Sequence, residues 1–185
     1  YFIITDVDNI FLNYNNKNQK RIKIATSTEI KKWLDENIEW ISYETQYVSK
    51  LDPDDIKTHC KDKNSLRFDF MIEPHDGLQM LIEYDGMQHF ESVKLFGGEV
   101  SFIDTRKKDI IKSYYCWKYK IPLLRIHCSN KKLIPELLKA FIETHRYKLA
   151  SNPLIYSNKR KYQELHSETI NEIYNMNKYL NQHKN

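Results

Sequence analysis

The sequence predicts an α/β domain in which a mixed sheet with a central β-hairpin is flanked by helices and followed by a C-terminal helix. The hairpin is indicated by two short apolar runs, residues 66–72 and 78–84, separated by the turn residues Pro74-His75-Asp76-Gly77. Apolar side chains at helical spacing before and after it predict the covering helices. A length of 185 residues allows one domain with a full hydrophobic core and an appendage.

Local patterns predict the other elements. The residues Thr26-Ser27-Thr28-Glu29 are typical of a helix start, with Glu29 in the first turn. The chain is expected to divide into an N-terminal strand and linker (1–25), a main domain (26–150) and a helical extension (151–185). Besides the hairpin, the patterns predict a strand in 1–14, a strand in 38–48, an exposed loop at 49–65, a helix at 100–119, a strand at 121–126, a helix at 131–146 and an amphipathic helix at 159–182.

Acidic residues concentrate on one face of the predicted hairpin. Side chains alternate along a strand, so Glu83 and Asp85 share a face. Asp69 lies between Phe68 and Phe70 and is expected to point away from the face that both rings occupy. Carboxylates this close raise one another's pKa unless a cation lies among them. An oxygen-rich cluster suits Mg²⁺ or Mn²⁺, and we favour a metal site over a solvated sheet face with scattered acids.

The same stretch resembles the active-site core of the PD-(D/E)xK nuclease superfamily. It is most similar to the branch that contains very short patch repair endonucleases and EDxHD homing endonucleases. The resemblance covers about residues 26–128. The residues that carry it are, in the order of the family, Glu29, Asp69, Glu83-Tyr84-Asp85-Gly86, Gln88-His89-Phe90, Asp109, Lys112, Tyr115 and the strand 121–126. One residue departs from the pattern: Asp85 replaces the lysine that the family has two residues after Glu83.

The resemblance implies a restriction-endonuclease-like fold and metal-dependent hydrolysis of DNA phosphodiester bonds. The metal ligands that it implies are Asp69, Glu83 and Asp85. Glu29 would support the metal directly or through water, although a first-turn acid that favours the helix dipole fits the sequence equally well. His89 would orient or deprotonate the attacking water, and Lys112 would stabilise the charge that develops on the phosphate. The role of the missing lysine falls to His89, Gln88, Lys112 or the metal.

Basic residues on the predicted helix 100–119 are candidates for contacts with DNA. They are Arg106, Lys107, Lys108 and Lys112, which we expect on one face of the helix. Such a face is usually only solvated. Beside an acidic metal cluster it gains a function, because a phosphodiester must be drawn towards carboxylates that repel it. The net charge of +4 permits a nucleic-acid partner without requiring one.

Cysteine content and hydropathy indicate the cellular compartment in which the protein is expected to work. Three cysteines without a signal peptide favour a reducing intracellular location, in the cytoplasm or nucleus, and leave a viral or mobile-element origin open. No apolar run approaches the ~18 residues of a membrane helix, so we expect no membrane partner. The chain begins at Tyr1 rather than Met, which indicates a piece of a longer chain.

A structural zinc ion is implied by the repair endonucleases that the chain resembles. The candidate ligands are His59, Cys60, Cys116, His127 and Cys128. None of them forms the C-x-x-C spacing that makes a zinc site persuasive. We therefore favour a chain without zinc and interpret Cys116, which lies beside aromatic residues in a helical pattern, as a core residue.

Two alternatives to a nuclease stay open. Asp85 in the place of the lysine is consistent with a catalytically inactive nucleic-acid-binding module on the same fold. The apolar residues of 159–182 recur near heptad spacing, which is also consistent with a protein-interaction module that docks a partner or the rest of a longer chain.

Overall fold

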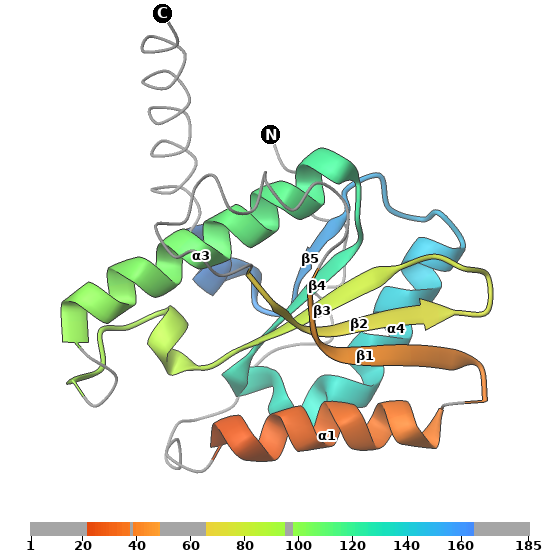
Figure 1. Ribbon diagram of the computed structural model, residues 1–185, viewed down its shortest axis with the longest axis horizontal. Coiled ribbons are helices and arrows are strands. Elements are labelled where there is room, and N and C mark those ends of the chain that lie inside the picture. The colour runs from red at the N-terminus through yellow and green to blue at the C-terminus, as the bar shows by residue number, and fades with distance from the viewer. Residues whose placement is uncertain (1–21, 38, 49–65, 95–97, 165–185) are drawn as a thin grey trace, which may run out of the picture.

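The computed structural model describes residues 22–37, 39–48, 66–94 and 98–164. They form a five-stranded mixed sheet in the order β1-β2-β3-β4-β5 (Figure 1). The first three strands are antiparallel neighbours, and β3, β4 and β5 run parallel. The strands are β1 (Ile41–Tyr47), β2 (Phe68–Pro74), β3 (Met80–Asp85), β4 (Leu123–His127) and β5 (Leu154–Tyr156).

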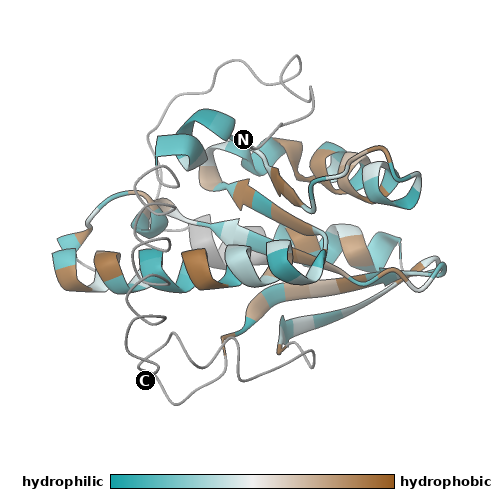
Figure 2. Cartoon of the chain, turned by 90° about the horizontal axis from the view of Figure 1, so that it is seen from above, coloured by the Kyte–Doolittle hydropathy of each residue, from teal (hydrophilic) through white to brown (hydrophobic). Residues whose placement is uncertain are grey.

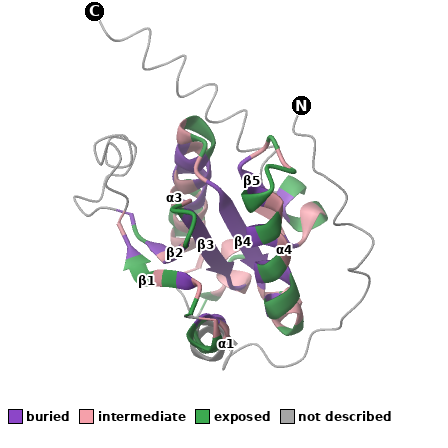
Figure 3. Ribbon diagram, turned by 90° about the vertical axis from the view of Figure 1, so that its right-hand side faces the viewer, coloured by how far each residue is buried: buried purple, intermediate pink, exposed green. Residues whose placement is uncertain are grey.

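Helices cover both faces of this sheet. One face packs against α1 (Ile22–Glu36) and α4 (Ile134–Arg146), and the other against α3 (Gly98–Tyr119) (Figure 3). Short 3-10 turns, η1 (Met87–His89) and η3 (Cys128–Leu133), follow β3 and β4. The chain is therefore an α/β protein with a mixed sheet between helical layers, as the sequence predicts.

The central hairpin is confirmed. β2 and β3 pair in antiparallel register, with Phe70 opposite Ile82. The turn between them has Gly77 at a φ of 76°, a backbone conformation that glycine adopts without steric cost. The Gly77 amide donates to the Pro74 carbonyl oxygen over 2.9 Å, which closes the turn.

The two central strands are the most buried part of the sheet. Every residue of β3 and β4 is buried (Figure 3), which fits strands covered by helices on both faces. Figure 2 shows hydrophobic stretches along the strands, whereas the helices carry hydrophilic residues as well. Glu83, Asp85 and Arg125 are charged residues inside this region. Buried charges need partners, so their surroundings identify the part of the fold where charge matters most.

Two details differ from the sequence prediction. Helix α1 begins at Ile22, so Glu29 lies in its middle rather than in a first turn at Thr26. Phe68 and Phe70 do not share a face. Phe68 packs against Tyr115 on the α3 side of the sheet, and Phe70 belongs to the cluster between the sheet and the helices α1 and α4. The register of β1 and β2 is the same on both sides of Asp69, but Gln46 of β1, at the level of Asp69, has a φ of 53°, so the strand is locally irregular there.

The predicted extension 151–185 contains a strand that the sequence pattern does not predict. β5 pairs with β4, with Leu154 opposite Leu123, and a helical turn at 159–164 follows it. With three residues, β5 is too short to show alternation. The predicted strand in 1–14, the loop 49–65 and residues 165–182 of the amphipathic segment lie outside the described residues.

Candidate active site

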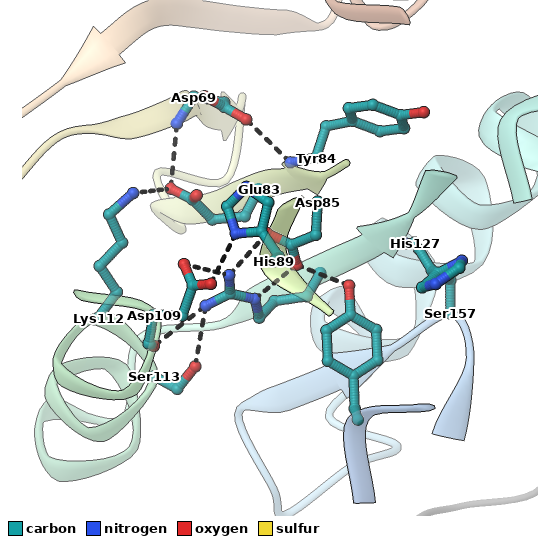
Figure 4. Close-up of polar contacts among 12 residues, drawn as sticks. Asp69, Glu83, Tyr84, Asp85, His89, Asp109, Lys112, Ser113, His127 and Ser157 are labelled. Atoms are coloured by element: carbon teal, nitrogen blue, oxygen red, sulfur yellow. Dashed lines mark hydrogen bonds and ion pairs between the residues drawn. The ribbon is translucent and has the colours of Figure 1, made fainter. Parts of the chain in front are cut away.

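Asp69 and Glu83 lie side by side where β2 and β3 stop pairing through their backbones. Beyond the pair Phe70 and Ile82, side chains take over the hydrogen bonds. The Asp69 amide donates to Glu83 Oε1 over 3.2 Å, and the Tyr84 amide donates to Asp69 Oδ2 over 2.9 Å (Figure 4). Backbone donors therefore hold both carboxylates in place. We call Asp69 and Glu83 the carboxylate pair.

Lys112 reaches the carboxylate pair from α3. Its Nζ donates to Glu83 Oε1 over 2.8 Å, and its side chain is only 12% exposed. Burial raises the pKa of Glu83 to about 7, although Lys112 opposes this change. Burial also disfavours the charged form of Lys112, but Glu83 and Asp109 outweigh it and raise the pKa of the lysine. The result is a buried ammonium beside two carboxylates that come from neighbouring strands.

Asp85 points into a separate set of contacts around Arg125. Arg125 is 1% exposed, and its Nε and Nη2 donate to the two oxygens of Asp85 over 2.7 and 2.6 Å. The same Nη2 lies 2.7 Å from Asp109 Oδ1, and Nη1 donates to Ser113 Oγ over 3.2 Å. Burial alone raises the pKa of Asp85, but the guanidinium outweighs it and lowers that pKa. Asp85 is thus an ionised partner of Arg125.

His89 joins these contacts from η1, directly after β3. Its Nδ1 lies 2.6 Å from Asp109 Oδ2 and 3.5 Å from Asp85 Oδ1. Burial raises the pKa of Asp109, but Arg125 and His89 outweigh it and keep this carboxylate ionised. An ionised carboxylate can only accept a hydrogen bond, so Nδ1 of His89 carries the proton and donates it. Nε2 is then left for proton exchange. Burial disfavours the imidazolium, but Asp109 and Asp85 outweigh it and raise the pKa of His89 above 6.5.

Tyr162 closes the same group from the helical turn at 159–164. Its hydroxyl donates to Asp85 Oδ2 over 2.6 Å, and the residue is 2% exposed. We call Asp85, His89, Asp109, Arg125 and Tyr162 the buried charge network. It draws on β3, η1, α3, β4 and the C-terminal turn, so it joins elements that are far apart in the sequence.

Two groups of residues are candidates for holding a metal ion. Among the described residues, the ligand atoms of Asp85, His89 and Asp109 lie within 4.8 Å of one another. Arg125 already lies between those two aspartates and pairs with both of them. A divalent cation there would face the guanidinium of Arg125, which stays charged. The carboxylate pair has Lys112 as its contacting cation, and carboxylate oxygens are the donors that suit a hard cation.

Glu29 lies elsewhere. Its Oε1 is 3.0 Å from the Nζ of Lys131, a residue of η3, and the Glu29 side chain is 43% exposed. It borders a groove of about 490 Å³ between α1 and the start of α4 together with Trp33 and Pro135. The partly exposed ion pair with Lys131 is a sufficient structural reason for an acid at position 29. The structure therefore does not bring Glu29 together with the carboxylate pair through any contact of its described side chain.

The basic residues of α3 do not form one exposed row, which corrects the expectation for Arg106, Lys107, Lys108 and Lys112. Lys107 is exposed, whereas Lys112 is directed at Glu83. Lys108 pairs with Asp104 over 2.7 Å. Arg106 lies over the Phe102 ring at 5.6 Å. Successive helical residues are about 100° apart, so the three consecutive residues Arg106, Lys107 and Lys108 already spread over about 200° of the helix.

The described residues provide no cysteine-based metal site. Cys116 is fully buried, and burial raises the pKa of its thiol, as expected for a core residue. Cys128 Sγ lies 4.0 Å from His127 Nδ1, and burial raises its pKa to about 11. Neither belongs to a group of three or more close ligand atoms in the described part of the chain. His59 and Cys60 lie outside the described residues.

Sequence reasoning missed Arg125, Ser113 and Tyr162, and assigned Asp109 to the site only through the resemblance. A signal existed for Arg125, which interrupts the apolar strand Leu123-Leu124-Arg125-Ile126. A charge inside a buried strand requires buried counter-charges. No local signal marks Tyr162, because its contact with Asp85 spans 77 residues of sequence.

The fold and these contacts define an α/β protein with a buried charge cluster at the end of its central strands. Comparison with family models places residues 64–175 in a family of unknown function (DUF5889), and the chain belongs to that family. Comparisons with curated proteins and with solved structures gave no match. No described helix is long and apolar enough to cross a membrane.

Proposed function

We propose that this protein is a metal-dependent endonuclease that hydrolyses DNA phosphodiester bonds on a core of the PD-(D/E)xK, restriction-endonuclease-like type. The observation that carries the proposal is the meeting of Asp69, Glu83 and Lys112. Lys112 Nζ lies 2.8 Å from Glu83 Oε1, and the Asp69 amide lies 3.2 Å from the same atom. Two carboxylates and one lysine at the end of neighbouring strands form the residue set of such a nuclease, with the lysine supplied by α3.

The carboxylate pair fits a hard divalent cation such as Mg²⁺ or Mn²⁺. Among the described residues, its hydrogen bonds fall on Glu83 Oε1 and Asp69 Oδ2, so the second oxygen of each carboxylate remains for an ion. Mg²⁺ is commonly held by one or two carboxylates together with substrate phosphate and water. When bound, such an ion polarises the scissile phosphate and lowers the pKa of an attacking water.

The remaining roles follow from where the side chains lie. Lys112 is a buried cation beside the carboxylate pair, where it can stabilise negative charge that develops on a phosphate oxygen. His89, held by Asp109 through Nδ1, has Nε2 available to accept a proton from water. Asp85 is bound on both oxygens by Arg125, so we leave it out of the metal site and assign it to the buried charge network.

The function is tested by incubating the full chain with supercoiled plasmid and Mg²⁺ or Mn²⁺. We expect nicked or linear products that EDTA suppresses and that the Asp69→Asn protein does not form. Asp76→Asn is a matched control, because Asp76 is an exposed carboxylate in the turn of the same hairpin. Equal cleavage by wild type and Asp69→Asn would contradict the proposal. DNA binding without cleavage under any of these conditions would support the inactive binding module instead.

Replacement of His89 by alanine should lower the cleavage rate by roughly 10²–10⁴-fold, as expected for loss of a general base. A base works in its deprotonated form. Because the pKa of His89 is raised above 6.5, the wild-type rate should climb with pH through a value above 6.5, and this limb should be missing in His89→Ala. The measurement is the pH dependence of kcat/KM for both proteins. An unchanged rate and limb would return His89 to a structural role.

A further inference from the structure

Tyr162 is a fully enclosed polar residue in a segment that the sequence assigns to an appendage. Its ring packs against Phe90 and Tyr156, with ring centres 5.1 and 4.8 Å apart, and its hydroxyl donates to Asp85 Oδ2 over 2.6 Å. Ring packing alone does not require a hydroxyl. The buried hydrogen bond to an ionised carboxylate therefore indicates a role beyond filling space.

Asp85 stands between Tyr162 and the Asp109–His89 pair. Its Oδ2 accepts from Tyr162, and its Oδ1 lies 2.6 Å from Arg125 Nη2 and 3.5 Å from His89 Nδ1. Asp85 and Asp109 therefore both face the single Nδ1 proton of His89. How strongly Asp85 attracts that proton depends on how much of its charge is taken up by its other donors, and Tyr162 is one of them.

We propose that Tyr162 is a positioning residue for the Asp109–His89 pair and acts through Asp85. The hydroxyl partly neutralises the charge of Asp85. The Nδ1–H of His89 therefore stays hydrogen-bonded to Asp109, and the ring keeps the orientation that sets the direction of Nε2. The proposal deepens the proposed function, because it rests on His89 as the proton acceptor of that reaction. It also makes the turn at 159–164 part of the active-site domain rather than of a separate extension.

The charged groups that face His89 make the direction of the effect clear. Asp109 comes from α3, Asp85 from β3 and Arg125 from β4. Both aspartates favour the imidazolium, and Arg125 disfavours it. Removing the Tyr162 hydroxyl leaves more of the Asp85 charge uncompensated. The imidazolium of His89 is then favoured further, and its titration should move to higher pH.

The test is an NMR titration of the histidine ring signals in full-length wild type and Tyr162→Phe, with the His89 signal assigned from His89→Ala. It needs neither metal nor DNA, so a failed cleavage assay leaves it interpretable. We expect the pKa of His89 to rise by roughly 0.5–1 in Tyr162→Phe, less than a full charge-assisted hydrogen bond because the change reaches His89 only through Asp85. Tyr147→Phe is the control, because Tyr147 is 65% exposed at the end of α4.

A second variant keeps the test decisive if Tyr162→Phe is poorly folded. Asp85→Asn removes the charge through which Tyr162 acts, so it should lower the pKa of His89. Adding Tyr162→Phe to Asp85→Asn should then change nothing further. An unchanged His89 titration in Asp85→Asn or in folded Tyr162→Phe would overturn the proposal, and so would equal effects of Tyr162→Phe with and without Asp85→Asn. In cleavage assays the same shift should appear in the acidic limb of the pH profile.

Discussion

Replacing Lys112 with methionine should lower the rate of DNA cleavage by roughly 10²–10³-fold, the usual cost of removing one group that stabilises charge in a transition state. The Lys112 ammonium lies over the Phe68 ring, with Nζ 5.4 Å from the ring centre, and methionine puts an uncharged side chain of similar length in its place. The loss therefore concerns the ammonium. Without it, Glu83 loses the cation that opposes its raised pKa, so a larger share of Glu83 is protonated at neutral pH.

The comparison for Lys112→Met is Lys108→Met, one helical turn earlier. Lys108 pairs with Asp104 at the surface rather than with the carboxylate pair. Its removal should weaken DNA binding slightly, through the loss of one phosphate contact at most, and should leave the rate at saturating DNA unchanged. Equal rates for Lys112→Met and wild type would exclude Lys112 from the reaction. The measurement is single-turnover cleavage with Mg²⁺ in excess.

Replacing Arg125 with methionine should lower the free energy of unfolding by about 3–5 kcal/mol at pH 7, the typical cost of breaking a buried ion pair from one side. Arg125 is 1% exposed and pairs with both Asp85 and Asp109. Its loss leaves two buried carboxylates with too little positive charge. Urea unfolding measures the effect. Arg160→Met is the control, because the Arg160 side chain is 90% exposed and its pairing with Glu164 contributes little.

The pH dependence of this loss gives its cause. In wild type, Arg125 lowers the pKa of Asp85 and Asp109 against the effect of burial, so the stability that they contribute is present above about pH 3.9 and is lost as pH falls through their folded-state values. In Arg125→Met, burial raises both pKa values, and stability is lost as pH rises. The difference in the free energy of unfolding between wild type and Arg125→Met should therefore shrink towards pH 4. A loss below about 1 kcal/mol, or one that grows in acid, would contradict the pairing.

The hairpin could be predicted from sequence because its signals are local. Alternation places Glu83 and Asp85 on one side of β3, and Gly77 marks the turn. The same alternation cannot tell the two acids apart. Glu83 meets Lys112, and Asp85 meets Arg125, because α3 crosses that face and β4 lies beside β3. These partners depend on tertiary packing, so the predicted cluster of three acids divides into a carboxylate pair and a charge network.

The C-terminal region shows a second limit of local reasoning. Residues 159–182 have a helical apolar pattern, which predicts a helix but not the surface that it contacts. Tyr162 is one apolar-spaced position in that pattern, yet its hydroxyl reaches Asp85, 77 residues earlier. β5 is likewise fixed by its pairing with β4 rather than by its own three residues. Contacts between distant segments decide both features.

The central claim is that Asp69 and Glu83 hold the metal, and calorimetric titration of Mn²⁺ into metal-free protein tests it most directly. Asp69→Asn keeps an oxygen that can accept from the Tyr84 amide, so this variant should fold while removing a ligand charge. We expect wild type and His89→Ala to bind Mn²⁺ alike, and Asp69→Asn to bind it at least roughly tenfold more weakly, since loss of even an outer partner of a ligand has a cost of that size. If His89→Ala lost the ion while Asp69→Asn kept it, the metal would belong to Asp85, His89 and Asp109, and the account would be wrong.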